Sequence, residues 1–292
     1  MTSMSPELCV AELEAKATRR VTPCGDGDMV WRLWGDGPPL VLLHGGHGSW
    51  THWIRNIAVL SQRYRLLVPD LPGYGESATP PEPHTAESLG AVLSRGLDLM
   101  LPQPARYAMV GFSLGGIIGG CAAALQRDRL RSLVIIGSSG LGLPSVGITG
   151  LMKWTPDMPR AQLRDIHRHN LATIMISNPD RIDDLALYLQ MENTLKARIK
   201  GSAIARSDAL ARALPAVRGR LMCLSGRQDV YVASNLEQRK ALFRAVQADT
   251  PFRDIDGAGH WVMFEAADAF NQTLLSLLDE ATAAQDGQEW TA

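Results

Sequence analysis

The sequence predicts an α/β fold in which helices cover both faces of a mostly parallel sheet. Short apolar segments that lead into Gly or Pro alternate with longer segments of helical periodicity along most of the chain. Such apolar segments are typical of strands that are buried on both faces. The 292 residues, of which 46% are hydrophobic and 20% charged, suffice for one large domain with a sizeable core.

The expected elements follow one another at regular intervals. A short helix is predicted within residues 6–18, where Leu8, Ala11 and Leu13 recur at helical spacing. Strands are expected within residues 29–37, 38–46, 64–77, 105–113, 130–140, 219–229 and 251–259, where apolar residues lead into turn residues. Helical patterns within residues 88–101, 114–128 and 233–247 lie between these strands.

One interval interrupts the alternation. About 80 residues separate two successive expected strands, whereas an ordinary crossover takes a few tens of residues. Its patterns are helical, within residues 160–176, 181–200 and 207–214. We therefore predict a core domain, residues 1–139 and 220–292, and an inserted helical lid, residues 140–219. The lid has 11 basic and seven acidic residues, a charge that a solvated helical surface explains equally well.

Charge and cysteine content disfavour several classes of protein. The chain carries 29 Lys and Arg against 30 Asp and Glu, which argues against nucleic acid or an anionic membrane surface as the main partner. Its four cysteines, Cys9, Cys24, Cys121 and Cys223, show no CxxC or metal-like spacing. No apolar run approaches the roughly 18 residues of a membrane span. We expect a cytoplasmic protein with free thiols that acts on a small-molecule substrate.

Ser113 lies in the sequence GFSLG, between an expected strand and an expected helix. The motif Gly-x-Ser-x-Gly requires this strand–turn–helix context. Gly111 and Gly115 remove side chains where the two backbones nearly touch, and the helix N-terminus favours developing negative charge. We predict that Ser113 is a nucleophile. A serine that caps the helix in an ordinary turn is the alternative interpretation.

Two downstream residues complete a candidate catalytic triad. A serine hydroxyl needs a base, and the base needs an acid that orients it. Asp229 follows an expected strand, and His260 lies in the loop after the next one. Because the C-terminal ends of parallel strands share one edge, we expect both to approach Ser113. Asp254 and Asp256 are closer to His260 in sequence but are interpreted as strand and turn residues.

A glycine loop near residue 45 is the candidate oxyanion hole. An expected strand runs into the sequence HGG at residues 44–46, where bare backbone can direct N–H groups at a developing negative charge. We predict that the N–H groups of Gly46 and Leu114 stabilise that charge. The loop also contains His44, His47 and His52, but these lack the helical spacing of zinc ligands, so neither a metal nor a cofactor is predicted.

Together these motifs resemble the α/β-hydrolase superfamily. The matching segments are LLHGGHGSWTHW, VPDLPGYGES, GFSLGG, GRQD and GAGHWVMFE, which span roughly residues 28–280. The resemblance implies an eight-stranded sheet, a helical cap after the sixth strand and a nucleophile elbow at Ser113. It points to members with Trp after the histidine, which include carboxylesterases, lipase-like enzymes and C–C bond hydrolases. Serine in place of aspartate disfavours epoxide hydrolase and haloalkane dehalogenase chemistry.

Three functions are compatible with this resemblance. We favour cleavage of a carboxylic ester through an acyl-enzyme. Hydrolysis of a C–C bond in vinylogous 1,5-diketone acids is the alternative, but those enzymes usually carry Asn where this chain has Phe112. The lid arginines that could bind such an acid are Arg160, Arg164, Arg168, Arg181 and Arg198. A small-molecule receptor on the same fold is the third hypothesis.

The substrate pocket is predicted from residues around the candidate triad. His47, Phe112 and Trp261 neighbour the glycine loop, the nucleophile and the histidine in the sequence. In the lid, Trp154 belongs to an apolar stretch at residues 151–158, and we expect it to form a wall of the pocket. Packing of the lid onto the core explains this stretch equally well.

Overall fold

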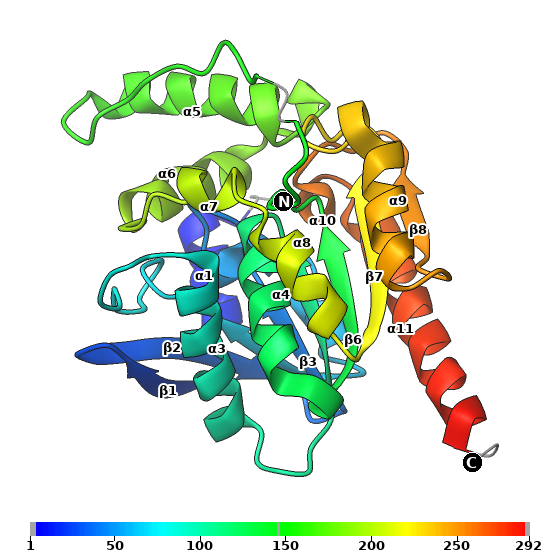
Figure 1. The fold of residues 1–292 in the computed structure, drawn as a ribbon. Helices are drawn as coiled ribbons and strands as arrows, with labels where there is room; N and C mark the ends of the chain where they lie inside the picture. Colours follow the sequence, from blue (N-terminus) through cyan, green and yellow to red (C-terminus); the bar gives the residue numbers. More distant parts are fainter. Residues whose placement is uncertain (1–3, 145–146, 290–292) are drawn as a thin grey trace.

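The computed structural model describes residues 4–144 and 147–289, and its centre is an eight-stranded sheet (Figure 1). The strands are β1 (Thr18–Cys24), β2 (Gly27–Trp34), β3 (Pro39–Leu43), β4 (Arg65–Pro69), β5 (Tyr107–Phe112), β6 (Leu130–Ile136), β7 (Arg220–Gly226) and β8 (Phe252–Ile255). Their order is β1-β2-β4-β3-β5-β6-β7-β8. The pairs β1–β2 and β2–β4 are antiparallel, and the other five pairs are parallel. The predicted mostly parallel sheet is confirmed.

The N-terminal region differs from the prediction. Helix α1 (Pro6–Glu14) ends before residue 18, and β1 then forms a hairpin with β2. The sequence pattern does not reveal β1, because five of its seven residues are exposed and it includes two arginines and two threonines. This edge strand is held by backbone pairing with β2, so burial imposes no apolar pattern on most of it.

Helices cover both faces of the sheet, as predicted. One face packs against α3 (Ala86–Met100), α4 (Leu114–Gln126) and α8 (Ala209–Ala213), and the other against α2 (Ile57–Leu60), α10 (Val262–Glu265) and α11 (Ala267–Glu289) (Figure 1). Helix α9 (Leu236–Val246) follows β7. A separate cluster of buried hydrophobic side chains lies on each face. All six residues of the central strand β5 are buried, which explains its continuous apolar sequence.

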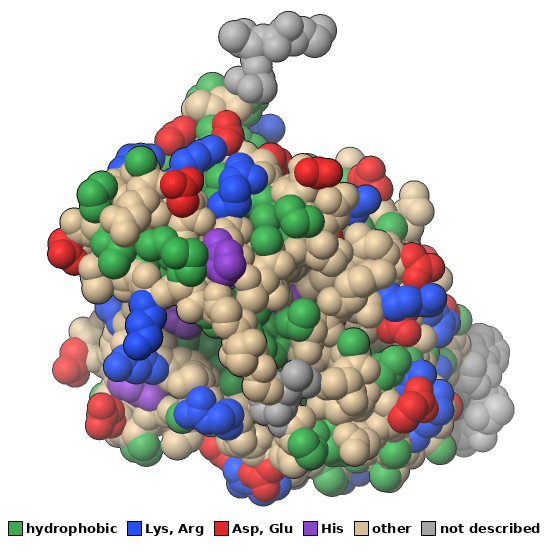
Figure 2. Space-filling model, turned by 90° about the horizontal axis from the view of Figure 1, so that it is seen from above, with side chains coloured by type: hydrophobic (Ala, Val, Ile, Leu, Met, Phe, Trp, Pro, Cys, Tyr) green, Lys and Arg blue, Asp and Glu red, His purple; other side chains and the backbone are tan. Residues whose placement is uncertain are grey.

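The segment between β6 and β7 is helical in its described part. It contains α5 (Arg160–Ile174), α6 (Asp184–Leu195), α7 (Ser202–Ala205) and α8. In Figure 1, α5 to α7 lie at the upper edge, toward which the arrow of β6 points. Figure 2 views this end of the molecule, where hydrophobic side chains gather beside lysines and arginines. Within the described residues, no helix combines the length and hydrophobicity that a membrane crossing requires.

Candidate active site

Ser113 occupies a strained turn between β5 and α4. Its φ of 51° and ψ of −117° lie outside the regions that most side chains adopt. A Cβ at Gly111 would lie 2.5 Å from the Gly116 Cα, and one at Gly115 would lie 2.4 Å from the His44 carbonyl oxygen. Both positions therefore require glycine, which explains the two glycines around this serine. Ser113 is only half-buried, while the strand before it is buried throughout.

Asp229 and His260 form a buried pair near the C-terminal ends of β7 and β8. The His260 Nδ1 and Asp229 Oδ2 atoms are 2.8 Å apart, and the two side chains are 3% and 1% exposed. Asp229 Oδ1 accepts a hydrogen bond from the backbone N–H of Tyr231 at 2.8 Å. The carboxylate thus holds the Nδ1–H tautomer of His260 and leaves Nε2 available as a base.

The two competing aspartates contact other residues. Asp254 Oδ1 accepts a hydrogen bond from the Ser225 hydroxyl at 2.8 Å. Asp256 forms an ion pair with Arg227 at 2.8 Å, and its side chain is 75% exposed. The carboxylate that contacts His260 is therefore that of Asp229. Gly137 at the end of β6 adjoins this pair, because a Cβ there would lie 2.6 Å from Asp229 Oδ2 and 3.0 Å from the His260 ring.

The glycine loop after β3 lies beside the nucleophile. A Cβ at Gly45 would lie 3.2 Å from the Ser113 Cβ, and one at Gly46 would lie 3.7 Å from the Leu114 side chain. Among the described residues, neither the Gly46 N–H nor the Leu114 N–H has a hydrogen-bond acceptor. Two free N–H groups beside a serine hydroxyl are the arrangement that an oxyanion hole requires.

Buried histidines hold this loop in place. His44 Nδ1 donates to the Gly45 carbonyl at 2.7 Å, and its Nε2 accepts the Leu71 N–H at 2.8 Å. His52 Nδ1 accepts the Gly45 N–H at 3.2 Å. Burial lowers the pKa of both histidines, and neighbouring histidines lower the pKa of His52 further. They are therefore neutral structural residues, whereas His47 is exposed and has a φ of 52°.

We expect the buried histidines to make the folded protein less stable in acid. Because the folded-state pKa of His52 lies well below 6.5, the unfolded chain binds a proton that the folded chain cannot bind as the pH falls below 6.5. We expect the free energy of unfolding to decrease over this range, by up to about 1.4 kcal/mol per pH unit for each such group. Urea denaturation at pH 7.5, 6.5 and 5.5 measures this. His52→Gln should show a smaller decrease, and an unchanged decrease would contradict the assignment.

The predicted pocket residues occupy different environments. Phe112 is fully buried, with its ring 4.8 Å from the His260 ring. Trp261 is also fully buried, stacks on Phe264 at 4.2 Å and donates to the His52 carbonyl at 3.1 Å, so it belongs to the core. Trp154 is half-buried, with its ring 5.1 Å from that of His167 on α5. A role of these side chains in binding substrate stays a prediction.

Sequence reasoning missed Arg239, which connects the loops around the candidate triad. This buried side chain donates to the Tyr231 carbonyl at 2.8 Å, to the Ser138 carbonyl and to the Asn235 side chain. The Tyr231 ring lies 4.5 Å from the His260 ring. Burial lowers the pKa of Arg239, while nearby Asp229 opposes this effect. The sequence did contain a signal for this residue. Arg239 precedes Phe243 by four positions, which places an arginine on the apolar face of α9.

Glu265 was also missed as a residue that positions the histidine loop. Its buried carboxylate accepts the backbone N–H groups of Gly259 at 2.7 Å, Ser177 at 3.0 Å and Asn178 at 2.8 Å. It therefore ties the residue before His260 to the loop after α5. The available signal for this role was an acidic residue within an apolar run, five residues after the histidine.

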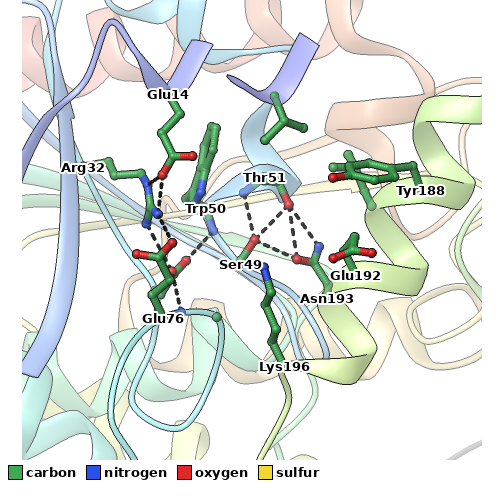
Figure 3. A pocket seen from close by; sticks show the side chains of 14 residues that line it. Glu14, Arg32, Ser49, Trp50, Thr51, Glu76, Tyr188, Glu192, Asn193 and Lys196 are labelled. Carbon is green, nitrogen blue, oxygen red and sulfur yellow. Dashed lines mark hydrogen bonds and ion pairs between the residues drawn. The ribbon is translucent and has the colours of Figure 1, made fainter. Parts of the chain in front are cut away.

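A polar pocket borders the glycine loop without including the candidate triad (Figure 3). On one side, Arg32 forms ion pairs with three acidic side chains. On the other, the Ser49 hydroxyl donates to Asn193 of α6 at 2.8 Å, and Asn193 donates to Thr51 at 3.0 Å. Its volume of about 80 Å³ holds a few water molecules, well below the size of ordinary substrate pockets. The hydrogen bonds that line this pocket therefore connect α6 with the core.

A comparison with family models identifies the chain. Residues 40–273, more than half of the 292 residues, match the model of the alpha/beta hydrolase family. The chain belongs to the alpha/beta hydrolase family. The match includes the strand before the glycine loop, the elbow at Ser113, and both Asp229 and His260. The resemblance identified from the sequence is therefore confirmed for this α/β hydrolase.

Several curated proteins are similar to this α/β hydrolase. A dihydrolipoyllysine-residue acetyltransferase component of the acetoin cleaving system of Pseudomonas putida is 28% identical over 83% of this chain and 64% of its own. A pimeloyl-[acyl-carrier protein] methyl ester esterase of Vibrio campbellii is 36% identical over 38% of this chain and 41% of its own. The chain thus spans less than two thirds of these two relatives. A 2-hydroxy-6-oxononadienedioate/2-hydroxy-6-oxononatrienedioate hydrolase of Escherichia coli is 26% identical over 91% and 93%.

Solved structures share the fold of this α/β hydrolase. A meta-cleavage product hydrolase of Pseudomonas fluorescens aligns with a TM-score of 0.71 and 20% identity, over 91% of this chain and 99% of the other. A bromoperoxidase of Bacillus anthracis aligns with a TM-score of 0.68 and 19% identity, over 90% and 100%. Because one architecture serves proteins with such different names, these similarities establish the fold alone.

Proposed function

We propose that this α/β hydrolase is a serine esterase that cleaves a carboxylic ester of a small, partly apolar substrate. The observation that carries the proposal is the buried Asp229–His260 pair, 2.8 Å apart, at the sheet edge where the strained turn presents Ser113. A buried carboxylate that fixes a histidine tautomer is needed for a base, and a strained serine turn is needed for a nucleophile. The free N–H groups of Gly46 and Leu114 support the same reaction.

In the proposed mechanism, His260 Nε2 takes the proton of the Ser113 hydroxyl as the oxygen attacks the ester carbonyl carbon. Asp229 stabilises the imidazolium that forms. The N–H groups of Gly46 and Leu114 bind the oxyanion, each contributing about 10² to 10³ in rate. His260 returns the proton to the leaving alcohol and then activates the water that releases the acid. Neither half of this reaction requires a cofactor.

We further propose that residues 140–219 form a lid over this edge of the sheet. Helices α5 to α7 lie above the strand ends in Figure 1, and the β6–β7 segment also exposes Leu151 and Met152, which are 44% and 46% exposed. Exposed apolar side chains beside a catalytic edge are typical of surfaces that receive apolar substrate groups. The substrate would then be a small molecule with an apolar acyl or alcohol group.

Hydrolysis of a C–C bond is the second candidate, favoured by the similarity to the Escherichia coli hydrolase along 91% of this chain. Two observations count against it. The position before Ser113 carries Phe112, which has no amide to bind a keto–enol oxygen. Four of the five candidate arginines already donate to protein acceptors, namely Arg164, Arg168, Arg181 and Arg198. Ester hydrolysis therefore remains the favoured reaction.

Two assays distinguish the candidate functions. The protein is treated with a fluorophosphonate probe, and its turnover of a short p-nitrophenyl ester is compared with that of a vinylogous 1,5-diketone acid. An esterase labels rapidly and prefers the ester, whereas a C–C hydrolase prefers the diketone acid. Absence of both labelling and turnover would contradict the proposal and favour a non-catalytic small-molecule receptor on this fold.

Trp154 provides a test of the lid as a specificity element. We expect Trp154→Ala to change the ratio of kcat/KM for a short and a long acyl ester by at least about fivefold, because a rigid wall of the pocket is removed. The melting temperature should change less. An unaltered ratio with a large decrease in melting temperature would place Trp154 in the packing against His167 alone. His167→Phe, which preserves an aromatic neighbour, is the matched control.

A further inference from the structure

A cleft of about 400 Å³ lies at the edge of the sheet where the parallel strands begin. Ser113 lies at the opposite edge, where these strands end. The walls of the cleft come from the first residues of β3, β5 and β6, from the loop before β4 and from the C-terminal half of α11. In Figure 1 this is the lower edge of the sheet. Pro39, Ala108 and Leu278 contribute apolar walls. The volume lies within the range of ordinary small-molecule sites.

Three arginines line this cleft and differ in their partners. Arg63 donates to both carboxylate oxygens of Asp279, at 3.2 and 2.7 Å. Arg131 also has an interaction partner. Arg106 has neither a hydrogen bond nor an ion pair among the described residues, although its Nε atom is buried. The cleft therefore contains one guanidinium whose charge and donors are uncompensated by the described chain.

The buried Nε–H group of the half-buried Arg106 side chain lacks an acceptor, which is unfavourable. A buried donor without an acceptor destabilises the folded state, and more strongly when the group is charged. The lining adds to this cost, because it contains three arginines and a single carboxylate, that of Asp279. Binding of an anion would remove both penalties.

Ser132 is a second hydrogen-bond donor in the lining of the cleft. It lines the cleft, and the residue as a whole is 1% exposed. In the sheet register Ser132 on β6 pairs with Ala108 on β5, two residues after Arg106. A guanidinium and a hydroxyl that line one cleft can both donate to the oxygens of a carboxylate or phosphate group.

We propose that this cleft binds a small organic anion. Arg106 and Ser132 hold its carboxylate or phosphate oxygens, and a short apolar tail lies along Pro39 and Leu278. The site uses the N-terminal ends of the strands, whereas the candidate triad uses their C-terminal ends, so this inference is independent of the proposed esterase function.

Calorimetric titration with three probes of equal chain length tests the proposal. Hexanoate and hexyl phosphate carry the two kinds of anionic head, and 1-hexanol carries none. The protein is first labelled with the fluorophosphonate probe, so that an acid cannot bind at Ser113 as a reaction product would. We expect one saturable site for at least one of the two anions, with the stronger anion identifying the head group, and at least tenfold weaker binding of hexanol.

Variants locate the site. Arg106→Gln should weaken binding of the anion at least tenfold, and Ser132→Ala about threefold or more, because each removes a donor to the anion. Arg95→Gln, an exposed arginine on α3, is the matched control and should leave binding unchanged. Absence of saturable binding by both anions, equal binding of hexanol, or equal effects of Arg106→Gln and Arg95→Gln would overturn the proposal. Failure of the fluorophosphonate label would instead count against the esterase.

Discussion

Replacement of Ser113 by alanine is expected to lower kcat/KM for an ester by about 10³-fold or more, because the attacking oxygen is removed while the oxyanion hole remains. The fold should survive the change. Ser113 already carries a Cβ at a φ of 51°, so alanine adds no backbone strain, and the residue is only half-buried. The measurement is kcat/KM with a p-nitrophenyl ester, together with the melting temperature and fluorophosphonate labelling.

Ser138 offers the matched control for this variant. It lies just after β6, is 1% exposed, and donates from its hydroxyl to the Ile136 carbonyl at 3.4 Å. Its backbone carbonyl, which Arg239 contacts, is retained in Ser138→Ala. That variant should therefore keep most of the activity. Wild-type activity in Ser113→Ala, or loss of activity in Ser138→Ala alone, would refute the assignment of the nucleophile.

Asp229→Asn is expected to lower the rate by about 10⁴-fold, the largest effect anticipated for this chain. The structure gives the physical reason. Asp229 Oδ1 already accepts the Tyr231 N–H, so an asparagine would orient its oxygen there and present its NH₂ group to His260. The histidine Nδ1 would then act as an acceptor and the proton would move to Nε2, which could no longer take the proton of Ser113.

Asp256 and Asp254 provide the controls for the acid. Asp256 directly follows β8 and contacts Arg227, whereas Asp254 lies within β8 and contacts Ser225. Asp256→Asn removes an exposed ion pair and should change the rate little. Asp254→Asn keeps an oxygen for the Ser225 hydroxyl and should behave similarly. If either control were inactive and Asp229→Asn active, the acid would be misassigned. The comparison uses kcat at saturating ester and the melting temperature of each variant.

Features that depend on local backbone chemistry could be predicted from the residues alone. The strand–turn–helix context of Ser113 was readable because a turn so tight accepts only glycine at positions 111 and 115. Strands such as β5 were readable because burial on both faces imposes a continuous apolar run. The edge strand β1 was not readable, since its pairing with β2 needs no apolar pattern.

Contacts between side chains that are distant in the chain became visible in the folded structure. The contact with His260 distinguishes Asp229 from Asp254 and Asp256. Asp229 and His260 are 31 residues apart in the chain. Trp261 was placed in the core, Trp154 against His167, and Arg239 between the loops that surround His260. None of these contacts follows from a motif, because each depends on how helices and loops pack after the sheet has formed. A motif records what one stretch of backbone tolerates, whereas contact between remote side chains is set by the packing of the whole chain.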